Sequence, residues 1–197
     1  NSLIAKQKKE EGTALISTVL FDDQTEILYD RISLDRIEPM NDRQYYVRGC
    51  TALLDALGGA IHHIGNVHKY AREEDRPEKT IFIITTDGME NSSHRYTYDK
   101  VKKMVERQRD RYGWEFLFLG ANIDAIEVAG RFGVQANRAV NYECDSEGTQ
   151  LNYEVLSKAV SRVRTCAAPT ATMAFDECDD WAEEIRADYS KRHRGRR

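Results

Sequence analysis

Two short runs of apolar residues constrain the fold of this chain more than any other feature. Residues 81–84 read Ile-Phe-Ile-Ile, and residues 116–119 read Phe-Leu-Phe-Leu. Runs of this length are typical of strands that are covered on both faces of a parallel sheet. The segment between them contains a predicted helix over 97–112, which ends before Gly113. A strand, a helix and a second strand in this order predict a crossover connection and an α/β fold.

The rest of the chain extends this pattern into a three-layer sandwich with a mostly parallel central sheet. Residues 13–21 and 26–32 are β-branched or alternate in polarity, and Asp22-Asp23 lies between them. They predict a hairpin whose second strand is an antiparallel strand near an edge. The other predicted elements are helices over 1–11, 52–71, 122–132, 148–166 and 179–189 and strands over 81–86, 114–119 and 139–142.

Length and composition fit a single globular domain with a short extension. The chain has 197 residues, of which 41% are hydrophobic and 31% charged, and its net charge is −4. These values exclude wholesale disorder, a coiled coil and a collagen-like fibre. We assign residues 1–166 to the α/β domain, residues 167–190 to a C-terminal extension with a helix, and residues 191–197 to a basic, disordered tail.

The basic tail raises the question of a nucleic-acid or lipid partner. Five of the last seven residues are Lys or Arg, a pattern that can bind nucleic acid or anionic lipid. The rest of the chain has no basic or aromatic stripe to extend such a surface. No apolar run approaches the roughly 20 residues that span a bilayer. We therefore expect a solvated tail, no nucleic acid and no membrane.

The spacing of the cysteines bears on the cellular compartment. Cys50, Cys144, Cys166 and Cys178 form no C-x-x-C pair. Scattered cysteines suit free thiols in a reducing compartment better than a disulfide framework. We therefore expect a cytoplasmic location.

Polar residues at the predicted strand ends are the main candidates for a functional site. Asp87 and Gly88 follow the most apolar strand directly, and Thr51 stands at the start of the long helix. In α/β sheets, ligands bind outside the carboxyl ends of the strands. A carboxylate and a hydroxyl are hard oxygen ligands, suited to Mg²⁺, Mn²⁺ or Ca²⁺. The structural alternative is that Thr51 caps the helix and Asp87 forms the turn.

The order of these features along the chain carries a family resemblance. A hairpin is followed by Gly49-Cys50-Thr51 opening a helix, and then by Thr85-Thr86-Asp87-Gly88 closing a buried strand. Over roughly residues 1–164 the chain resembles a bacterial-type von Willebrand factor type A (vWA) domain, which implies a Rossmann-like sandwich. In that family a metal-ion-dependent adhesion site (MIDAS) combines an Asp-x-Ser-x-Ser loop after the first strand with a Thr and an Asp on later loops. Thr51 and Asp87 match the Thr and the Asp.

The chain departs from this family at the first strand. It contains no Asp-x-Ser-x-Ser sequence, and by analogy that loop and its strand would precede Asn1. The resemblance therefore implies an incomplete MIDAS, with Thr51 and Asp87 as metal ligands and weak binding of Mg²⁺ or Mn²⁺. It also implies that strands 13–21 and 81–86 lack their shared neighbour. Because an unpaired apolar edge invites pairing with another chain, we expect either closure of the two strands on each other or self-association.

Three functions remain open. The resemblance implies an adhesion-type protein-protein interaction module without catalysis, in which a divalent cation accepts an acidic side chain from an unknown partner protein. One alternative is a metal-dependent hydrolase or phosphoryl-transfer domain with Asp87 as ligand or acid. Its nearby polar groups would be Asp22, Asn122 and Asp124. The other alternative is a scaffold subunit that binds no ligand.

Overall fold

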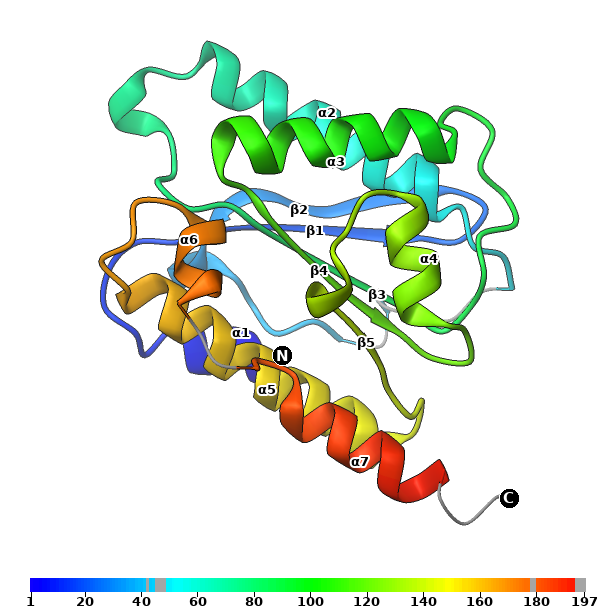
Figure 1. Cartoon of the computed structure of the whole chain (residues 1–197). Coiled ribbons are helices and arrows are strands. Elements are labelled where there is room, and N and C mark those ends of the chain that lie inside the picture. Colours follow the sequence, from blue (N-terminus) through cyan, green and yellow to red (C-terminus); the bar gives the residue numbers. More distant parts are fainter. Residues whose placement is uncertain (42, 45–48, 178–179, 194–197) are drawn as a thin grey trace.

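The structure is a computed structural model that describes residues 1–41, 43–44, 49–177 and 180–193. Helices and strands alternate along much of the chain (Figure 1). The strands are β1 (Leu15–Phe21), β2 (Thr25–Ser33), β3 (Ile81–Thr86), β4 (Glu115–Gly120) and β5 (Ala139–Asn141). The α-helices are α1 (Ser2–Gln7), α2 (Leu53–Tyr70), α3 (Tyr98–Tyr112), α4 (Ala125–Arg131), α5 (Ser146–Thr165), α6 (Ala171–Asp176) and α7 (Glu183–His193).

The strands form two sheets, one parallel and one antiparallel. β3, β4 and β5 are parallel, and Ile81 lies opposite Glu115 at the start of the β3–β4 pair. β1 and β2 form an antiparallel hairpin in which Leu15 lies opposite Ser33. In Figure 1, β1 and the three parallel strands run toward the same side of the molecule. The loops that follow these strands therefore share one edge, which we call the carboxyl edge and at which ligands of α/β folds bind.

The predicted α/β class is confirmed, but the predicted single sheet is not observed among the described residues. β1 and β3 belong to separate sheets, so these two strands do not close on each other. Both keep exposed apolar side chains: Leu15 of β1 is 44% exposed and Ile83 of β3 is 36% exposed. In contrast, every residue of the middle strand β4 is buried. β1 and β3, which were expected to lack a neighbouring strand, are thus more exposed than β4, which lies between two strands.

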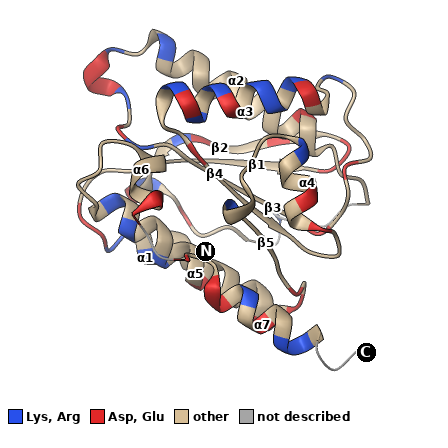
Figure 2. Cartoon of the chain, viewed as in Figure 1, with Lys and Arg blue, Asp and Glu red and all other residues tan. Residues whose placement is uncertain are grey.

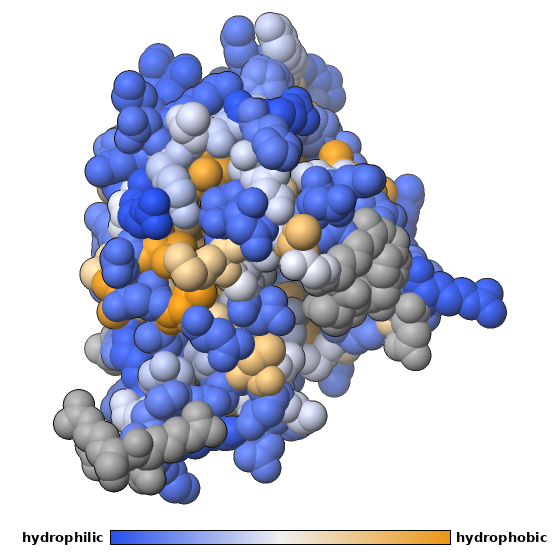
Figure 3. All heavy atoms as spheres, turned by 90° about the vertical axis from the view of Figure 1, so that its right-hand side faces the viewer, coloured by the Kyte–Doolittle hydropathy of each residue, from blue (hydrophilic) through white to orange (hydrophobic). Residues whose placement is uncertain are grey.

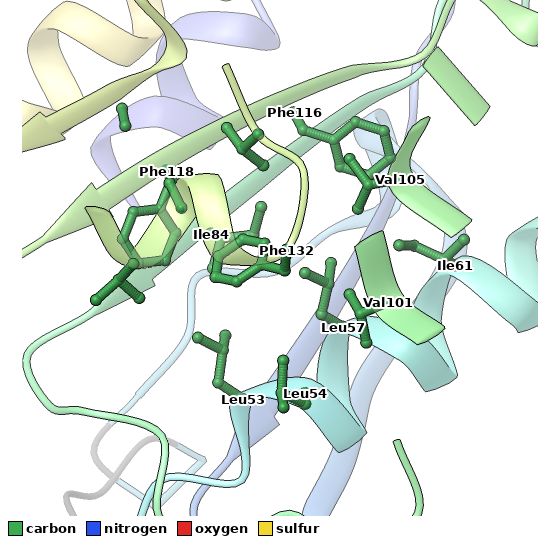
Figure 4. Close-up of a cluster of buried hydrophobic side chains, with 14 of the residues drawn as sticks. Leu53, Leu54, Leu57, Ile61, Ile84, Val101, Val105, Phe116, Phe118 and Phe132 are labelled. Atoms are coloured by element: carbon green, nitrogen blue, oxygen red, sulfur yellow. The ribbon is translucent and has the colours of Figure 1, made fainter. Parts of the chain in front are cut away.

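Apolar side chains fill both faces of the parallel sheet. The first cluster joins α2, α3 and α4 to one face (Figure 4), and its members include Leu53, Leu57, Ile61, Ile84, Val101, Val105, Phe116, Phe118 and Phe132. Phe21 of β1 packs against the same cluster, so the hairpin shares this core. The second cluster joins α5, α6 and α7 to the other face through residues such as Leu117, Leu119, Leu156, Phe175 and Ile185.

The C-terminal region differs from its prediction in two respects. α6 was not predicted, and the last helix lies at Glu183–His193 instead of 179–189. Phe175 and Ile185 place both helices in the second cluster, so residues beyond 166 complete the core of the sandwich. The part of the predicted disordered tail that the structure describes, residues 191–193, is helical. Cys178 and residues 194–197 lie outside the described ranges.

Short polar side chains fix several helix starts. Thr97 accepts a hydrogen bond from the Lys100 backbone and so caps α3. Asp124 caps α4 in the same way, and Asp145 caps α5. In the ranges that the structure describes, no helix is both long and apolar enough to cross a membrane.

A charged pair lies inside the fold where the sequence predicts only an apolar strand. Arg138 Nε lies 3.2 Å from Glu115 Oε2, and Arg138 Nη2 lies 2.5 Å from Asp176 Oδ1. The side chains of Glu115 and Arg138 are only 3% and 5% exposed, whereas that of Asp176 is 61% exposed. Burial raises the pKa of Glu115, and the positive charge of Arg138 opposes that rise. This pair ties the start of β4 to the segment that precedes β5.

Candidate functional site

Thr51 and the turn at Asp87 come together at the carboxyl edge. β3 ends at Thr86, so Asp87 is the first residue beyond the strand. A Cβ atom built on Gly88 would lie 3.0 Å from Thr51 Oγ1, which places the Thr51 hydroxyl against this turn. The backbone of Thr51 is held from the same loop: Thr51 N–H donates to Asn91 Oδ1 (2.9 Å), and Asn91 N–H donates to the Thr51 carbonyl (3.0 Å). The structure thus brings together two loops that are far apart in sequence.

Thr51 is not the N-cap of α2, and the side-chain hydrogen bonds of the turn after β3 are made by Thr86. The N-cap position of α2 is Ala52, which makes no side-chain cap hydrogen bond. The turn after β3 is held by Thr86, whose Oγ1 accepts the Gly88 N–H (3.3 Å) and donates to the Gly88 carbonyl (3.1 Å). Asp87 itself is exposed. Asp87 therefore lies at the surface of the carboxyl edge, and the half-buried Thr51 lies against the turn that follows it.

Glu90 fixes the loop after Gly88 to the first turn of α2. Its Oε2 accepts hydrogen bonds from Leu54 N–H and Ser93 Oγ, both at 2.8 Å. Its Oε1 accepts the N–H groups of Ser92 (3.0 Å) and Ser93 (2.8 Å). Because one carboxylate satisfies donors of both the loop and the helix start, it holds the two segments in one arrangement.

Asp55 fixes the next part of the same loop. Its carboxylate accepts three backbone N–H groups, from His94 (2.9 Å), Arg95 (2.9 Å) and Tyr96 (2.8 Å). Desolvation acts to raise the pKa of Asp55, but these three donors and the charge of Arg95 outweigh it and hold the pKa below its usual value. Glu90 and Asp55 were not predicted, since their partners become visible only when α2 and the loop pack together.

Cys144 reaches Asp87 from a third loop. Its Sγ lies 3.9 Å from Asp87 Oδ2, across 57 positions of sequence. Cys144 is exposed, whereas the neighbouring Tyr142 is buried. Burial raises the pKa of Tyr142, and the adjacent Cys144 and Asp87 add to that rise. The loop between β5 and α5 therefore forms one wall of the site, with a thiol beside the carboxylate.

A divalent cation at this edge would find few ligands on the described residues. Mg²⁺ is often bound through one or two carboxylates and retains several waters. Within the described ranges, no group of three or more His, Cys, Asp or Glu residues could hold a metal ion. A cation at this edge would thus rest on one hydroxyl, one carboxylate and water, or on further ligands from a partner.

The other polar groups considered at strand ends carry local roles. Asp22 is buried, and its Oδ1 accepts the Gln24 N–H at 2.6 Å in the hairpin turn. Asp124 is engaged as the α4 cap, its Oδ1 accepting the Glu127 N–H at 3.0 Å. Asn122 adopts a left-handed backbone conformation with φ 57° in the turn after β4. The hydrolase interpretation therefore gains no positioned base or nucleophile from these three residues.

Exposed apolar side chains lie in the loops and first helical turns of the carboxyl edge. Met89 follows Asp87 and Gly88 and is 60% exposed, and Ile126 in the first turn of α4 is 49% exposed. Figure 3 views the side of the molecule toward which the strands run and shows apolar patches bordered by hydrophilic side chains. Apolar groups beside a polar centre are typical of surfaces that bind other proteins.

Comparisons with known proteins add no relative on which these assignments could rest. The searches against protein-family models, curated proteins and solved structures each gave no match for this chain.

Proposed function

We propose that the chain is a protein-protein interaction module of vWA type and that its carboxyl edge binds a partner protein. The observation that carries this proposal is the closeness of Thr51 Oγ1 to the Gly88 turn. A Cβ atom built on Gly88 would lie 3.0 Å from this oxygen. This contact places a hydroxyl and the Asp87 carboxylate on one surface, beside the exposed Met89. The loop that carries Asp87 and Met89 is hydrogen-bonded to α2 through Glu90 and Asp55. This part of the surface therefore holds one arrangement before a partner binds.

Each residue has a separate part in the proposed mechanism. A divalent cation, when bound, supplies positive charge that attracts an acidic side chain of the partner. Thr51 and Asp87 hold that cation through oxygen atoms. Asn91 orients the Thr51 backbone, and Met89 offers apolar contact area at the rim. Because the chain supplies only two oxygen ligands in this scheme, the partner's carboxylate contributes a large share of the cation's affinity.

Calorimetric titration with Mn²⁺ tests this role of the two residues. We expect binding with a Kd of about 1 mM, at the weak end for oxygen-ligand sites. Asp87→Ala and Thr51→Ala should each weaken binding by about tenfold or abolish it. Thr13→Ala and Asp35→Ala are matched controls, since both positions lie at the opposite end of the hairpin. Equal loss in all four variants, or binding that persists in Asp87→Ala, would exclude the proposed site.

Self-association through the partly exposed strands β1 and β3 is a second part of the proposal. Ile83 is exposed on β3, which pairs on one side only among the residues that the structure describes. Exposed apolar strands with free backbone groups pair readily with another chain. Sedimentation velocity over a protein concentration series should therefore show a species larger than the 22.7 kDa monomer. Ile83→Lys should shift it to monomer, whereas Met173→Lys, on the exposed side of α6, should not; a wild-type monomer at every concentration would refute it.

The cytoplasm remains the proposed location. Cys50, Cys144 and Cys166, the described cysteines, are free thiols, which suits a reducing compartment. Fractionation of cells that express the chain would test this, and recovery from an oxidising compartment would contradict it.

A further inference from the structure

The last turn of α7 forms ion pairs with the loop that carries Cys144. Arg192 Nη1 lies 2.5 Å from Asp145 Oδ2, and Arg192 Nη2 lies 3.2 Å from Glu147 Oε2. His193 Nδ1 lies 3.0 Å from Glu143 Oε1. The two residues that flank Cys144 in sequence are therefore both held from α7. Figure 2 shows the basic end of α7 next to the acidic loop between β5 and α5.

Arg192 and the helix that carries it are held in place by other contacts. Arg192 Nε also lies 2.9 Å from Asp188 Oδ2 one turn earlier in α7, which orients the guanidinium. Ile185 buries the helix in the second core cluster, and Lys158 of α5 pairs with Glu184 at 2.9 Å. α7 is thus packed against the rest of the domain, so its last turn can hold the loop in one position.

The loop is also confined on its other side. A Cβ atom built on Gly148 would lie 2.1 Å from the Glu143 carbonyl oxygen, so the loop turns back closely onto the start of α5. Asp145 Oδ1 accepts the Gly148 N–H at 2.8 Å in the same turn. The loop is thus held by α7 on one side and by the start of α5 on the other. From this loop Cys144 reaches Asp87, with its Sγ 3.9 Å from Asp87 Oδ2.

We infer that the last turn of α7 is a latch, with Arg192 as a positioning residue that holds Cys144 against Asp87. When the latch is closed, one oxygen of Asp87 faces a thiol from a neighbouring loop. When α7 is displaced, the loop loses its ion pairs with Arg192 and His193, and Cys144 moves away from the carboxylate. The C-terminal helix thereby governs the surroundings of the candidate site; this consequence rests on the proposed function, whereas the positioning of Cys144 does not.

A disulfide probe measures this positioning directly. Asp87→Cys places a second thiol next to Cys144, and Cys50, Cys166 and Cys178 are changed to Ser so that one pair remains. The effective concentration of the two thiols is read from the glutathione ratio at which the disulfide forms. Adding Arg192→Ala should lower it by about tenfold, because the loop then samples more positions.

The matched control lies on the same helix. Arg186 forms an ion pair with Asp180 and, among the described residues, no hydrogen bond or ion pair with residues 143–147. Arg186→Ala should therefore leave the effective concentration within about twofold of its starting value. Arg192→Lys should recover part of the effect, because it keeps the charge but not the fork of donors. Equal effects of Arg192→Ala and Arg186→Ala would overturn the latch.

A salt series provides a second measurement that needs no change at Arg192. The Arg192 pairs are partly exposed and therefore screened by salt. Raising NaCl from about 0.05 to about 0.5 M should lower the effective concentration several-fold, and salt independence would contradict the latch. Neither measurement uses a metal ion, so the latch can stand or fall independently of cation binding at Asp87.

Discussion

Replacing Glu115 by alanine is expected to lower the free energy of unfolding by about 3 kcal/mol, because the variant leaves a buried guanidinium without its buried partner. Arg138 is 5% exposed and lies 3.2 Å from Glu115 Oε2. Its remaining partner, Asp176, is 61% exposed and compensates only part of the charge. Urea denaturation followed by circular dichroism measures the difference.

Two comparisons separate this effect from a general cost of strand mutations. Glu26 is an exposed strand residue of β2, and Glu26→Ala should change the free energy of unfolding by less than about 0.5 kcal/mol. In the double variant Glu115→Leu with Arg138→Leu, both charges are removed, and at least half of the lost stability should return. A loss in Glu115→Ala no larger than in Glu26→Ala would show that the pair does not stabilise this core.

The second large effect is expected at Gly148. A Cβ atom there would lie 2.1 Å from the Glu143 carbonyl oxygen and 3.0 Å from its carbon. Both are backbone atoms that cannot rotate away, so Gly148→Ala must displace the loop or the first turn of α5. We expect a loss of about 2–3 kcal/mol, the range for overpacked sites. Thermal or urea unfolding of the variant measures it.

Gly130 supplies the matched control for this substitution. It lies in α4, and a Cβ atom built on it meets nothing within 4 Å. Gly130→Ala should therefore raise the free energy of unfolding by up to about 1 kcal/mol, through the better helix propensity of alanine. A Gly148→Ala variant as stable as Gly130→Ala would mean that the loop from Glu143 to Gly148 is free to shift, which would also weaken the case for the latch.

The elements with strong local signals were predicted well from sequence. The strand over 81–86 matches β3 residue by residue, because four consecutive apolar residues between polar segments leave little choice of boundary. The helix predicted over 97–112 likewise matches α3 to within one residue, because Gly113 ends it locally. Such features depend on contacts within a few residues, which a sequence shows directly.

The C-terminal region was predicted less well because its structure depends on distant contacts. α6 has only six residues, too few to display a helical period. α7 extends to His193 because its last turn pairs with Glu143, Asp145 and Glu147, residues more than 40 positions away. A run of basic residues at a chain end otherwise favours a solvated tail, which is what the sequence predicted.

In the candidate site, too, contacts between residues far apart in sequence were not visible in local patterns. The contact between the Thr51 loop and the Asp87 loop was expected from the family resemblance, which carries long-range information. Asp55, Glu90 and Cys144 were not assigned to the site, because their partners lie 36 to 57 positions away. The resemblance also implied that β1 and β3 lack a shared neighbour, and these two strands do lie in separate sheets.

The most direct test of a cation site formed by Thr51 and Asp87 is to locate Mn²⁺ on the ¹⁵N-labelled protein by NMR. Paramagnetic broadening should reduce the amide signals of Thr51 and Gly88 well before those of Thr13 and Asp35, and this difference should vanish in Asp87→Ala. Broadening that is uniform, or that remains at Thr51 and Gly88 in Asp87→Ala, would contradict the site.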